Sequence, residues 1–591
     1  MRVIATAGHV DHGKSALVRA LTGIEPDRWE EEHRRGMTID LGYAWTTLAS
    51  GEELAFVDVP GHQRFIGNML AGLGPAPAVL FVVAADEGWR QQSGEHLAAV
   101  DALGLRHGLL VVTRCDLADP AAALEDAAQR LAASSLGACQ AVAVSARTGE
   151  GLAELRAALD RLVSRLPDPV TGGRVRLWVD RSFTIRGSGT VVTGTLGEGT
   201  IAVGDQLQLG RETVRVRGVQ SLGRARDSVS AVARVAVNLR GVGAHEVHRG
   251  DVLLTPGAWP VTSSVDVRLS RVVERLPASL MVHVGTVGTQ ARVRPLGAEA
   301  LRLTTTAPLP LRAGDRMILR DPGAQHVLAG ATVVDADPPP LRRRGAAARR
   351  GQELAHANGS LDLGREVARR GAMLRQDAVA LGLAVDDDTL GSTDSIVREG
   401  DWLISVSTWH GWADALRAAV RAQAARDPLE PTLTLEAARV AAGVADRVLV
   451  PPVANAAGLH VAGGRVGAPE VRPRLGDRAE AGLRTLEARL REEPFAAPER
   501  PDLEAAGLGT REVAAAVRTG RLIRFEGDVL LLPSSPARAM QVLARLPQPF
   551  TTSQARQALD TTRRVVIPLL EHLDGRGWTR RLDGSHREVR R

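Results

Sequence analysis

Lysine is almost absent from this sequence: of 74 lysines and arginines, only Lys14 is a lysine. Aromatic residues make up 3% of the chain, which argues against a nucleic-acid surface built mainly from aromatic rings stacked on bases. The two cysteines, Cys115 and Cys139, lack zinc-ligand spacing and are too few for a disulfide framework, as in a reducing cytosol. No apolar run approaches the ~20 residues that cross a bilayer, so we expect a cytoplasmic protein without a membrane partner.

The composition that is present is typical of a globular chain with several domains. At 591 residues, the length indicates about four domains of ordinary size. Hydrophobic residues make up 44% and charged residues 24%, which is enough for extensive cores. The sequence pI near 10.4 and the formal charge of +6 favour contact with nucleic acid.

The single lysine lies in a phosphate-binding pattern, Gly8-His9-Val10-Asp11-His12-Gly13-Lys14-Ser15. In G-x-x-x-x-G-K-[ST] loops, backbone N–H groups surround the α- and β-phosphates of a nucleotide, and the lysine ammonium reaches the β- and γ-phosphates. The planar guanidinium of arginine would not fit that loop, so the two cations are not interchangeable there. The pattern predicts a nucleoside triphosphate site.

Residues 1 to about 170 predict an α/β domain with a mostly parallel sheet. Short β-branched runs alternate with alanine- and leucine-rich helical stretches, and the first seven residues predict a strand rather than a signal peptide. The expected strands are Val3–Ala7, Leu54–Val59, Val79–Ala84, Leu109–Thr113 and Ala141–Val144. Nucleotides bind at the carboxyl ends of such strands, which is where the motifs of this domain lie.

Polar residues after three of these strands indicate a guanine nucleotide. Asp58 ends the second strand and is placed to hold Mg²⁺ through water, and the Gly61 N–H is placed to sense a γ-phosphate. Thr38 lies in a charge-rich segment that suits a loop ordered by the triphosphate and the metal. Asp116, after the fourth strand, can accept hydrogen bonds from the guanine N1–H and amine, whereas adenine would leave it unpaired.

These motifs resemble those of the translational GTPases, the group that contains elongation factor Tu. The resemblance rests on Gly8–Ser15 and on Asp58-Val59-Pro60-Gly61-His62. It implies Mg²⁺ ligands at Ser15 and Thr38, with Asp58 acting through water, and a catalytic histidine, His62, that orients the attacking water. It also implies a hydrophobic gate, Val10 and Ile39, which keeps His62 away from that water until the ribosome engages.

The base site departs from the family pattern N-K-x-D. Here it is Thr113-Arg114-Cys115-Asp116, followed after the fifth strand by Ser145 and Ala146. Arg114 can still lay its guanidinium plane over a purine, whereas Thr113 offers less to the ring than asparagine. We expect guanine specificity to survive through Asp116, with base affinity altered.

Residues from about 171 to 340 predict two small antiparallel β-barrels, because Gly-Asp turns recur between alternating apolar runs. The run Asp180 to Thr195 and the run Arg35 to Tyr43 are similar to one branch of the family, the selenocysteine-specific elongation factors (SelB). A selenol ionises more readily than a thiol, so such a factor can separate selenocysteine from serine by charge. The resemblance makes Arg181 the candidate cation, oriented by Asp180, with Arg240 as a second cation; an ordinary surface ion pair is the alternative for Asp180 and Arg181.

The C-terminal part repeats a pattern of helix, glycine break, helix and hairpin, after a linker that the prolines at 338–340 and the arginines up to Arg350 predict to be stiff and basic. Hairpin turns at Gly400, Gly463, Gly527 and Gly584 are spaced by 63, 64 and 57 residues, which indicates four tandem winged-helix domains. In the last one we expect helices at Thr551–Leu559 and Thr561–Asp574, and a hairpin of Trp578–Leu582 with His586–Val589.

Arginines concentrate in this last unit. A solvated surface explains part of such clustering, but positions on a recognition helix and a wing favour phosphate contact. Resemblance to the SelB C-terminus implies that the unit binds a hairpin in messenger RNA. The candidate RNA-binding residues are Arg556, Arg563, Arg564, Arg580, Arg581 and Arg587.

Together these observations predict a multidomain GTPase that delivers selenocysteinyl-tRNA to the ribosome at recoded stop codons, as a monomer with GTP and Mg²⁺ as cofactors. A general aminoacyl-tRNA carrier and a GTP-switched nucleic-acid-binding regulator are the alternatives; the first has no use for the winged helices, and the second none for the barrels. The expected domains are the GTP-binding domain at 1–170, barrels at 171–258 and 259–341, and winged helices at 342–406, 407–470, 471–533 and 534–591.

Overall fold

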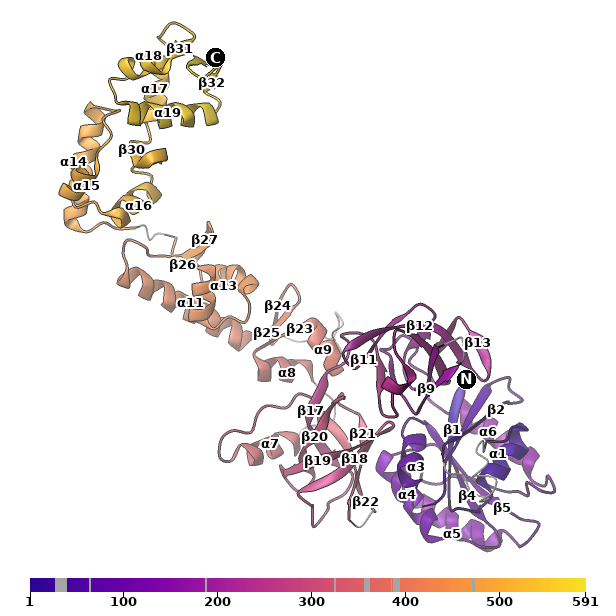
Figure 1. Ribbon diagram of the computed structural model, residues 1–591. Coiled ribbons are helices and arrows are strands. Elements are labelled where there is room, and N and C mark those ends of the chain that lie inside the picture. Colours follow the sequence, from indigo (N-terminus) through magenta and orange to yellow (C-terminus); the bar gives the residue numbers. More distant parts are fainter. Residues whose placement is uncertain are drawn as a thin grey trace. The chain divides into compact units, whose positions relative to one another are not determined.

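The computed structural model describes residues 1–26, 40–62, 65–185, 189–323, 326–355, 362–383, 385, 394–469 and 473–590. The chain divides into two compact units (Figure 1). The N-terminal unit comprises residues 1–366 and 373–393, and the C-terminal unit comprises residues 367–372 and 394–591. No helix in the described part of the chain is long and apolar enough to span a membrane.

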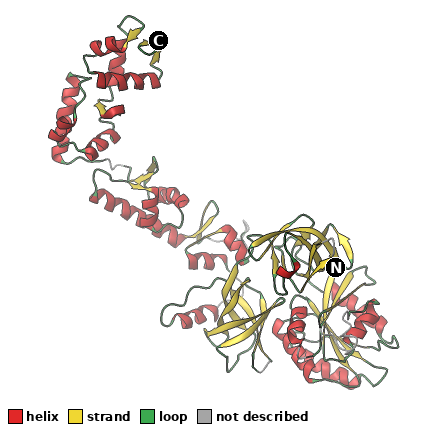
Figure 2. Cartoon of the chain, in the orientation of Figure 1, coloured by secondary structure: helices red, strands yellow, loops and turns green. Residues whose placement is uncertain are grey.

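The first domain is a six-stranded sheet covered by helices on both faces (Figure 2). The strand order is β2-β3-β1-β4-β5-β6, and every pairing is parallel except that of β2 with β3. The strands are β1 (Arg2–Ala7), β2 (Gly42–Thr47), β3 (Glu53–Asp58), β4 (Ala78–Ala84), β5 (Gly108–Thr113) and β6 (Gln140–Ala143). The helices are α1 (Lys14–Thr22), α3 (Ile66–Leu73), α4 (Gln91–Leu103), α5 (Ala121–Ala132) and α6 (Leu152–Ser164).

Alternation along the strands builds two cores. Ile4 of β1 packs with Leu17 of α1 and Leu159 of α6 on one face of the sheet. Val3 and Ala5 pack on the other face, with side chains of α3, α4 and α5. The five predicted strands are confirmed, each to within one residue at either end. The antiparallel edge strand β2 was not predicted, because it follows directly on a polar, charge-rich segment.

The second domain is an antiparallel sheet with the order β7-β16-β11-β12-β15-β9-β8, on which β13 pairs with β12; β10 and β14 form a separate pair. Its elements are β7 (Arg176–Trp178), β8 (Arg181–Ile185), β9 (Gly189–Leu196), β10 (Thr200–Ala202), β11 (Gln206–Leu209), β12 (Glu212–Ser221), β13 (Arg224–Arg226), β14 (Ser228–Ser230), β15 (Ala233–Arg240), the 3-10 helix η2 (Ala244–Glu246) and β16 (Val252–Leu254).

The third domain is a closed barrel with the strand order β17-β20-β19-β18-β21-β22. Its strands are β17 (Val261–Leu269), β18 (Ser279–Val284), β19 (Val287–Pro295), β20 (Ala300–Pro310), β21 (Arg316–Arg320) and β22 (Val327–Asp335). At the predicted Gly-Asp turns the glycine has a positive φ, and the aspartate carboxylate accepts a backbone N–H three residues earlier, as Asp315 does from Arg312 at 2.8 Å.

The prediction of a linker from Pro338 to Arg350 is wrong for the second half of that segment. Residues Ala346–Ala355 form helix α7, which packs against the closed barrel through Leu354. Arg350 is 7% exposed and its guanidinium pairs with Asp266 at 2.8 Å and Asp335 at 2.6 Å. Arg350, which the linker prediction treated as a solvated charge, is therefore part of a buried ion-pair network. Sequence composition cannot distinguish such a network from a basic linker.

Helices and hairpins alternate through the remaining chain. At the border between the two units lie α8 (Leu363–Arg370), β23 (Ala372–Leu374) and α9 (Arg375–Leu381). Beyond them come β24 (Ile396–Glu399), β25 (Trp402–Ser405), α11 (Val406–Arg426), β26 (Leu433–Thr434), α12 (Leu435–Ala442), η3 (Arg447–Leu449), α13 (Val450–Ala456), β27 (His460–Ala462), β28 (Arg465–Gly467), α14 (Asp477–Glu492), α15 (Arg500–Ala505), α16 (Thr510–Arg518), β29 (Ile523–Phe525), η4 (Glu526–Asp528), β30 (Val529–Leu531), α17 (Ser535–Leu543), β31 (Phe550–Thr551), α18 (Thr552–Ala558), α19 (Arg563–Gly575), β32 (Thr579–Arg581) and β33 (His586–Val589).

The predicted hairpins are confirmed at β24–β25, β27–β28, β29–β30 and β32–β33. In the last repeat, α18 and α19 match the predicted helices to within two residues at each end. The hydroxyl of Thr551 accepts the Gln554 N–H at the start of α18, and the Gln554 side chain accepts the Thr551 N–H in return. Buried residues of α14, α16, α17, α18 and α19 share one core, which includes Leu483, Leu543 and Leu569.

Candidate nucleotide site and aminoacyl pocket

The phosphate-binding loop joins β1 to α1 and depends on two glycines. Gly8 has φ 136°, and a Cβ at this position would lie 2.1 Å from the carbonyl oxygen of Val82. Gly13 has φ 77°, and helix α1 begins at the next residue, Lys14. The loop therefore leads its backbone N–H groups into a helix N-terminus, which is the arrangement that binds phosphate.

Lys14 is buried at this loop and donates to backbone carbonyls. Its Nζ lies 3.1 Å from the Gly8 oxygen and 2.7 Å from the His9 oxygen. Beside it, the Gly8 N–H donates to His96 Nδ1 at 3.0 Å. Burial, with a contribution from the Lys14 ammonium, lowers the pKa of His96 to about 3. The surroundings of Lys14 therefore offer neutral acceptors at neutral pH.

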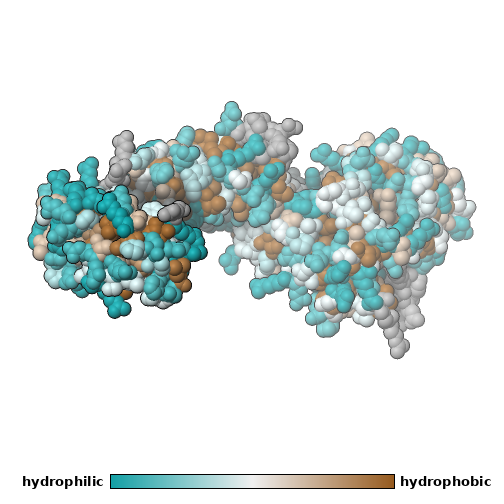
Figure 3. Space-filling model, turned by 90° about the horizontal axis from the view of Figure 1, so that it is seen from above, coloured by the Kyte–Doolittle hydropathy of each residue, from teal (hydrophilic) through white to brown (hydrophobic). Residues whose placement is uncertain are grey.

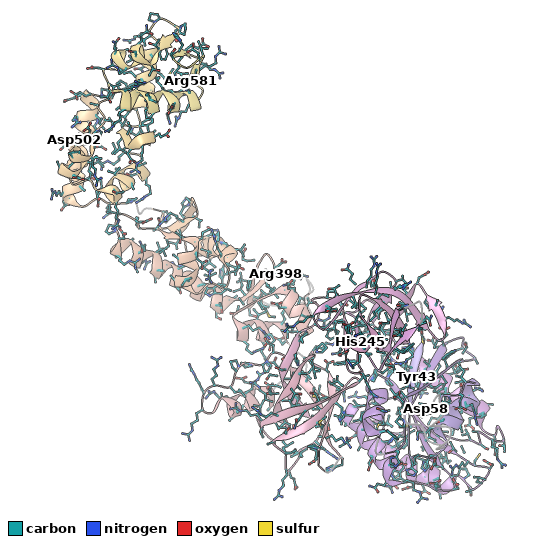
Figure 4. The ribbon with its side chains drawn as sticks, viewed as in Figure 1. Tyr43, Asp58, His245, Arg398, Asp502 and Arg581 are labelled. Carbon is teal, nitrogen blue, oxygen red and sulfur yellow. The ribbon has the colours of Figure 1, made fainter. Side chains whose placement is uncertain are left out.

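Oxygen ligands suited to Mg²⁺ meet beside the loop. The Ser15 hydroxyl donates to Asp58 Oδ2 at 2.6 Å, and the Thr6 hydroxyl donates to Asp58 Oδ1 at 2.7 Å. Asp58 is fully buried at the end of β3 (Figure 4). A hydroxyl and a carboxylate fit a hard cation such as Mg²⁺. Thr38, the other predicted ligand, lies outside the described residues.

The segment after β3 lies against the phosphate-binding loop. A Cβ on Gly61 would lie 2.5 Å from the Val10 nitrogen and 2.7 Å from Lys14 Nζ, so no larger residue fits there. His62 follows, half-buried, with its ring centre 6.2 Å from that of Phe65. The structure therefore brings Gly61, the residue before His62, against the loop. Ile39, the partner of Val10 in the predicted gate, lies outside the described residues.

At the predicted base site, Thr113 and Arg114 contact the protein itself. The buried Thr113 hydroxyl donates to the His12 carbonyl at 2.7 Å and so supports the phosphate-binding loop. Arg114 has φ 58° and its Nη1 pairs with Asp86 at 3.0 Å and Glu87 at 2.9 Å, while Nη2 donates to the Asp11 carbonyl. Sequence reasoning assigned both residues to the base and could not foresee these acidic partners.

Asp116 lies beside Ser145 and Ala146, as the motif predicts, and also pairs with a residue that was not predicted. Arg147 Nε donates to Asp116 Oδ2 at 2.9 Å. Hydrogen bonds from Ser145 and then from Arg147 lower the pKa of the Asp116 carboxyl. The carboxylate that the guanine would need is therefore ionised, and the exposed Arg147 covers it. The sequence signal for this ion pair was the basic residue Arg147 directly after Ser145-Ala146.

Arg181 connects the second domain to the first. It lies on β8, and its Nε donates to Asp40 Oδ2 at 3.0 Å while Nη2 donates to the Leu41 carbonyl. Asp180 does not pair with Arg181 as expected: it accepts from the Thr193 hydroxyl at 2.6 Å and from Arg234 Nη2 at 2.7 Å. Asp180, just before β8, and Arg181, its first residue, therefore have different partners.

The ring of Tyr43 on β2, labelled in Figure 4, is in contact with two of these arginines. The Arg234 guanidinium carbon is 3.8 Å from the centre of its ring, and that of Arg181 is 5.2 Å away. Burial raises the pKa of the Tyr43 hydroxyl. Beside them is a cavity of about 220 Å³, lined by Tyr43, Trp45, Arg181, Phe183, Thr193 and Arg234.

Arg240 is not brought to this cavity. It is exposed at the end of β15 and pairs with Arg215 of β12. On β15, Ala236 pairs with Thr193 of β9, which in turn pairs with Arg181 of β8. Four residues of strand separate Ala236 from Arg240, about 13 Å. Arg234, on the same face of β15, is the arginine that the structure places beside Arg181, and sequence reasoning missed it.

Family models match three separate regions. Residues 1–165 match the elongation factor Tu GTP binding domain, and residues 267–340 match the β-barrel domain of the selenocysteine-specific elongation factor. Residues 541–587 match the winged helix of elongation factor SelB. The resemblance to the SelB branch of the EF-Tu-like translational GTPases is confirmed. The comparisons support a GTP-binding domain, β-barrel domains and a C-terminal winged-helix region.

Curated relatives named selenocysteine-specific elongation factor are similar to this chain over part of their length. The selenocysteine-specific elongation factor of Desulfomicrobium baculatum is 36% identical over 360 residues, and that of Escherichia coli (strain K12) is 37% identical over 353. Each alignment covers 58% of this chain and 56% of the relative, so the chain spans about half the length of the curated relatives it matches.

Solved structures show the same fold. The crystal structure of a bacterial selenocysteine-specific elongation factor, EF-Sec, matches with a TM-score of 0.82 over 100% of both chains, at 24% identity. SelB from Methanococcus maripaludis with the GTP analogue GppNHp matches with a TM-score of 0.51 over 57% of this chain and 79% of that chain, at 22% identity.

The arginines of the SelB-like winged helix fall into two groups. Arg563 and Arg564 open α19 and are exposed, as are Arg580 and Arg581 of β32, while Arg556 of α18 is half-buried. Some carry protein partners: Arg580 pairs with Glu588 at 2.7 Å, and Arg564 donates to the Pro498 carbonyl at 2.9 Å. The visible surface of the C-terminal unit is mostly hydrophilic, with small hydrophobic areas (Figure 3).

Arg587 is the exception among the six predicted RNA-binding residues. It is 4% exposed, and its Nε donates to Asp574 of α19 at 2.8 Å. Its Nη1 donates to the Thr552 hydroxyl at 3.2 Å. This arginine therefore holds the hairpin to the helices of its own domain, and its burial removes it from the surface set.

Proposed function

We propose that this protein is a GTP-dependent translation elongation factor that delivers selenocysteinyl-tRNA to the ribosome at recoded stop codons. The observation that carries the proposal is the combination of an elongation factor Tu-type GTP-binding domain with SelB-type models at the closed barrel and at the last winged helix. A protein with this role works as a monomer in the cytoplasm. Its four tandem winged helices would end in the one that binds a messenger RNA hairpin.

GTP hydrolysis would use the groups that the structure brings together around the phosphate-binding loop. Lys14 would turn from its loop carbonyls to the β- and γ-phosphates. Ser15, Thr38 and, through water, Asp58 would hold Mg²⁺, which neutralises phosphate charge when bound. His62 would orient the attacking water once Val10 and Ile39 let it approach on the ribosome.

Asp116 would select guanine by accepting hydrogen bonds from its N1–H and exocyclic amine. Arg147 must then leave the Asp116 oxygen that it contacts, and its side chain is 76% exposed, so the ion pair is weak and easily broken. Thr113 and Arg114 would act on the loop rather than on the base, because their polar groups already contact His12, Asp11, Asp86 and Glu87.

The aminoacyl end would bind in the cavity beside Tyr43, with Arg181 as the cation for a selenolate. Arg234 is paired with Asp180 and stabilises the wall of that cavity. The charge of Arg181 is balanced by Asp40, which follows the predicted Mg²⁺ ligand Thr38 by two residues. Coordination of Mg²⁺ by Thr38 in the GTP state would therefore act on Asp40, two residues away, and change the charge that the pocket presents.

The test is the spontaneous deacylation of selenocysteinyl-tRNA, and of the same tRNA carrying serine, each with this protein and GTP. Protection of the selenocysteinyl ester alone is expected, and Arg181→Ala should remove it. Arg224→Ala, an exposed arginine of β13, is the matched control and should protect like the wild type. Equal protection of both esters would favour a general aminoacyl-tRNA carrier, and protection of neither would favour a GTP-switched nucleic-acid-binding regulator.

A further inference from the structure

Two histidines of the phosphate-binding loop converge on a glutamate of another loop. One ring nitrogen of His9, one of His12 and a carboxylate oxygen of Glu87 all lie within 4.8 Å of one another. His12 is fully buried, and the two rings meet edge to face with their centres 4.9 Å apart. Two imidazoles and a carboxylate are the donor set of many zinc sites in proteins.

The ring of His12 lies between two acceptors. Its Nδ1 is 3.4 Å from the Val82 carbonyl oxygen, and its Nε2 is 3.8 Å from Glu87 Oε2. A neutral imidazole carries one N–H, so whichever nitrogen is protonated, the other turns a lone pair towards an oxygen.

A metal ion would resolve it. With the proton on Nδ1, His12 donates to the Val82 carbonyl, which is the usual outer contact of a metal-bound histidine, and Nε2 is free to ligate. Neither His12 Nε2 nor His9 Nδ1 has a hydrogen-bond partner among the residues that the structure describes. Both are buried nitrogens at one place, and unpaired buried polar atoms call for a ligand.

We propose that His9, His12 and Glu87 form a binding site for a transition-metal dication of the Zn²⁺ type, separate from the Mg²⁺ that accompanies the nucleotide. Imidazole nitrogens favour Zn²⁺, Co²⁺ and Ni²⁺, whereas Mg²⁺ prefers oxygen ligands. The three ligands leave a position for water, and the ion fixes the phosphate-binding loop to the loop after β4. The proposal does not depend on the protein's role in translation.

Two arginines adjust the carboxylate of this site. Arg114 Nη1 pairs with Glu87 Oε1 at 2.9 Å, which leaves Oε2 facing His12. Arg90 Nε approaches the same Oε2 at 3.5 Å, with a side chain that is half exposed. Arg90 therefore competes with the metal for this oxygen and must move when the ion binds, so removing it should tighten binding.

The experiment is a Co²⁺ titration of the full-length, nucleotide-free chain, followed through the visible absorption bands of the metal, with Zn²⁺ as competitor. Saturation at one equivalent and displacement by Zn²⁺ are expected. Glu87→Gln should weaken Co²⁺ binding about tenfold or more, and Arg90→Ala should strengthen it about threefold. Asp126→Asn, which removes an exposed carboxylate of α5 paired with Arg130, is the matched control and should change affinity by less than about twofold.

Three results would overturn the site. The first is the lack of saturable binding in the wild type, and the second is equal affinity of the wild type and Glu87→Gln. The third is a near-ultraviolet sulfur-to-metal band that disappears, together with the binding, in a Cys115→Ser, Cys139→Ser double variant. The gain expected for Arg90→Ala does not depend on a loss of fold, so it separates ligation from destabilisation.

Discussion

Lys14 of the phosphate-binding loop and Arg181 of the cavity beside Tyr43 are both cations held by oxygen atoms of the protein, and the kind of oxygen differs between them. The Lys14 ammonium donates to the carbonyls of Gly8 and His9, which are uncharged acceptors. Arg181 is held by the carboxylate of Asp40, which offsets part of its charge and also lies 3.8 Å from Arg249. Phosphate is charged in every state of a nucleotide, so its site needs no competing anion beside the lysine. A carboxylate beside Arg181 would compete with a selenolate and so would help the proposed pocket to release it.

The largest effect is expected at the histidine beside the first site. His62→Ala should slow ribosome-stimulated GTP hydrolysis about a thousandfold, because the attacking water loses the group that orients it. GTP affinity should stay within about threefold of wild type, because the role proposed for His62 is in hydrolysis and not in binding the phosphates. Single-turnover hydrolysis and equilibrium titration with a fluorescent GTP analogue measure the two quantities. An equal loss in both would place His62 in binding instead.

Removal of the Lys14 ammonium should weaken GTP binding rather than slow GTP hydrolysis. Lys14→Ala should weaken GTP about a hundredfold, because a charge-assisted contact with phosphate in a buried site is lost. The same titration measures it, and Arg19→Ala, on the exposed side of α1, is the control. A change below about threefold would contradict the role of the only lysine in the chain.

Acid should destabilise the first site through His96. Its folded pKa of about 3 lies below the unfolded value near 6.5, so the unfolded chain binds more protons between these values and stability falls as pH drops below about 6.5. From pH 7 to pH 5 the loss is about 2 kcal/mol. Unfolding of the full chain, compared with His96→Asn, measures the difference, and identical pH dependence in the two proteins would refute it.

Neutralising the Asp40 carboxylate beside Arg181 should strengthen the binding of selenocysteinyl-tRNA. Asp40→Asn should raise the affinity of the GDP-bound protein for selenocysteinyl-tRNA about tenfold, since Arg181 then presents an uncancelled charge to the selenolate. Affinity for the seryl form should not change, because a hydroxyl carries no charge. Fluorescent-tRNA titration in GDP measures both. An equal rise for the two esters would mean that Asp40 acts on the tRNA body instead.

The smallest effect is expected in the last winged helix, where each RNA contact would be one of several. Arg563→Ala should weaken binding of the insertion hairpin about fivefold and reduce the slope of log affinity against log salt by about one. Arg500→Ala, which removes an arginine 90% exposed and paired with Glu504, is the matched control. Binding is measured at several salt concentrations, and an unchanged slope for Arg563→Ala would exclude a phosphate contact.

The GTP-binding domain could be predicted well because its signals are local. A glycine at positive φ, a lysine at a helix start and an aspartate at a strand end stand in fixed order along the chain, as at Gly13, Lys14 and Asp58. The strands could be located because buried parallel strands are continuous apolar runs. The Gly-Asp turns of the barrels are local in the same sense, since Asp315 bonds a residue three positions away.

What could not be predicted depends on partners distant in sequence. Arg181 pairs with Asp40 across 141 positions, and Arg350 pairs with Asp266 across 84. Arg587 finds Asp574 only because its hairpin folds back onto α19. With arginine at nearly every basic position, composition cannot separate an arginine that meets phosphate from one that closes an ion pair inside the fold.

The measurement that tests the account most directly is the affinity of the protein for selenocysteinyl-tRNA and seryl-tRNA, each with GTP and with GDP. We expect tight binding for one combination only, selenocysteinyl-tRNA with GTP, because the proposed pocket would depend on the nucleotide through Asp40. Affinities that are equal for the two esters, or unchanged between GTP and GDP, would contradict it.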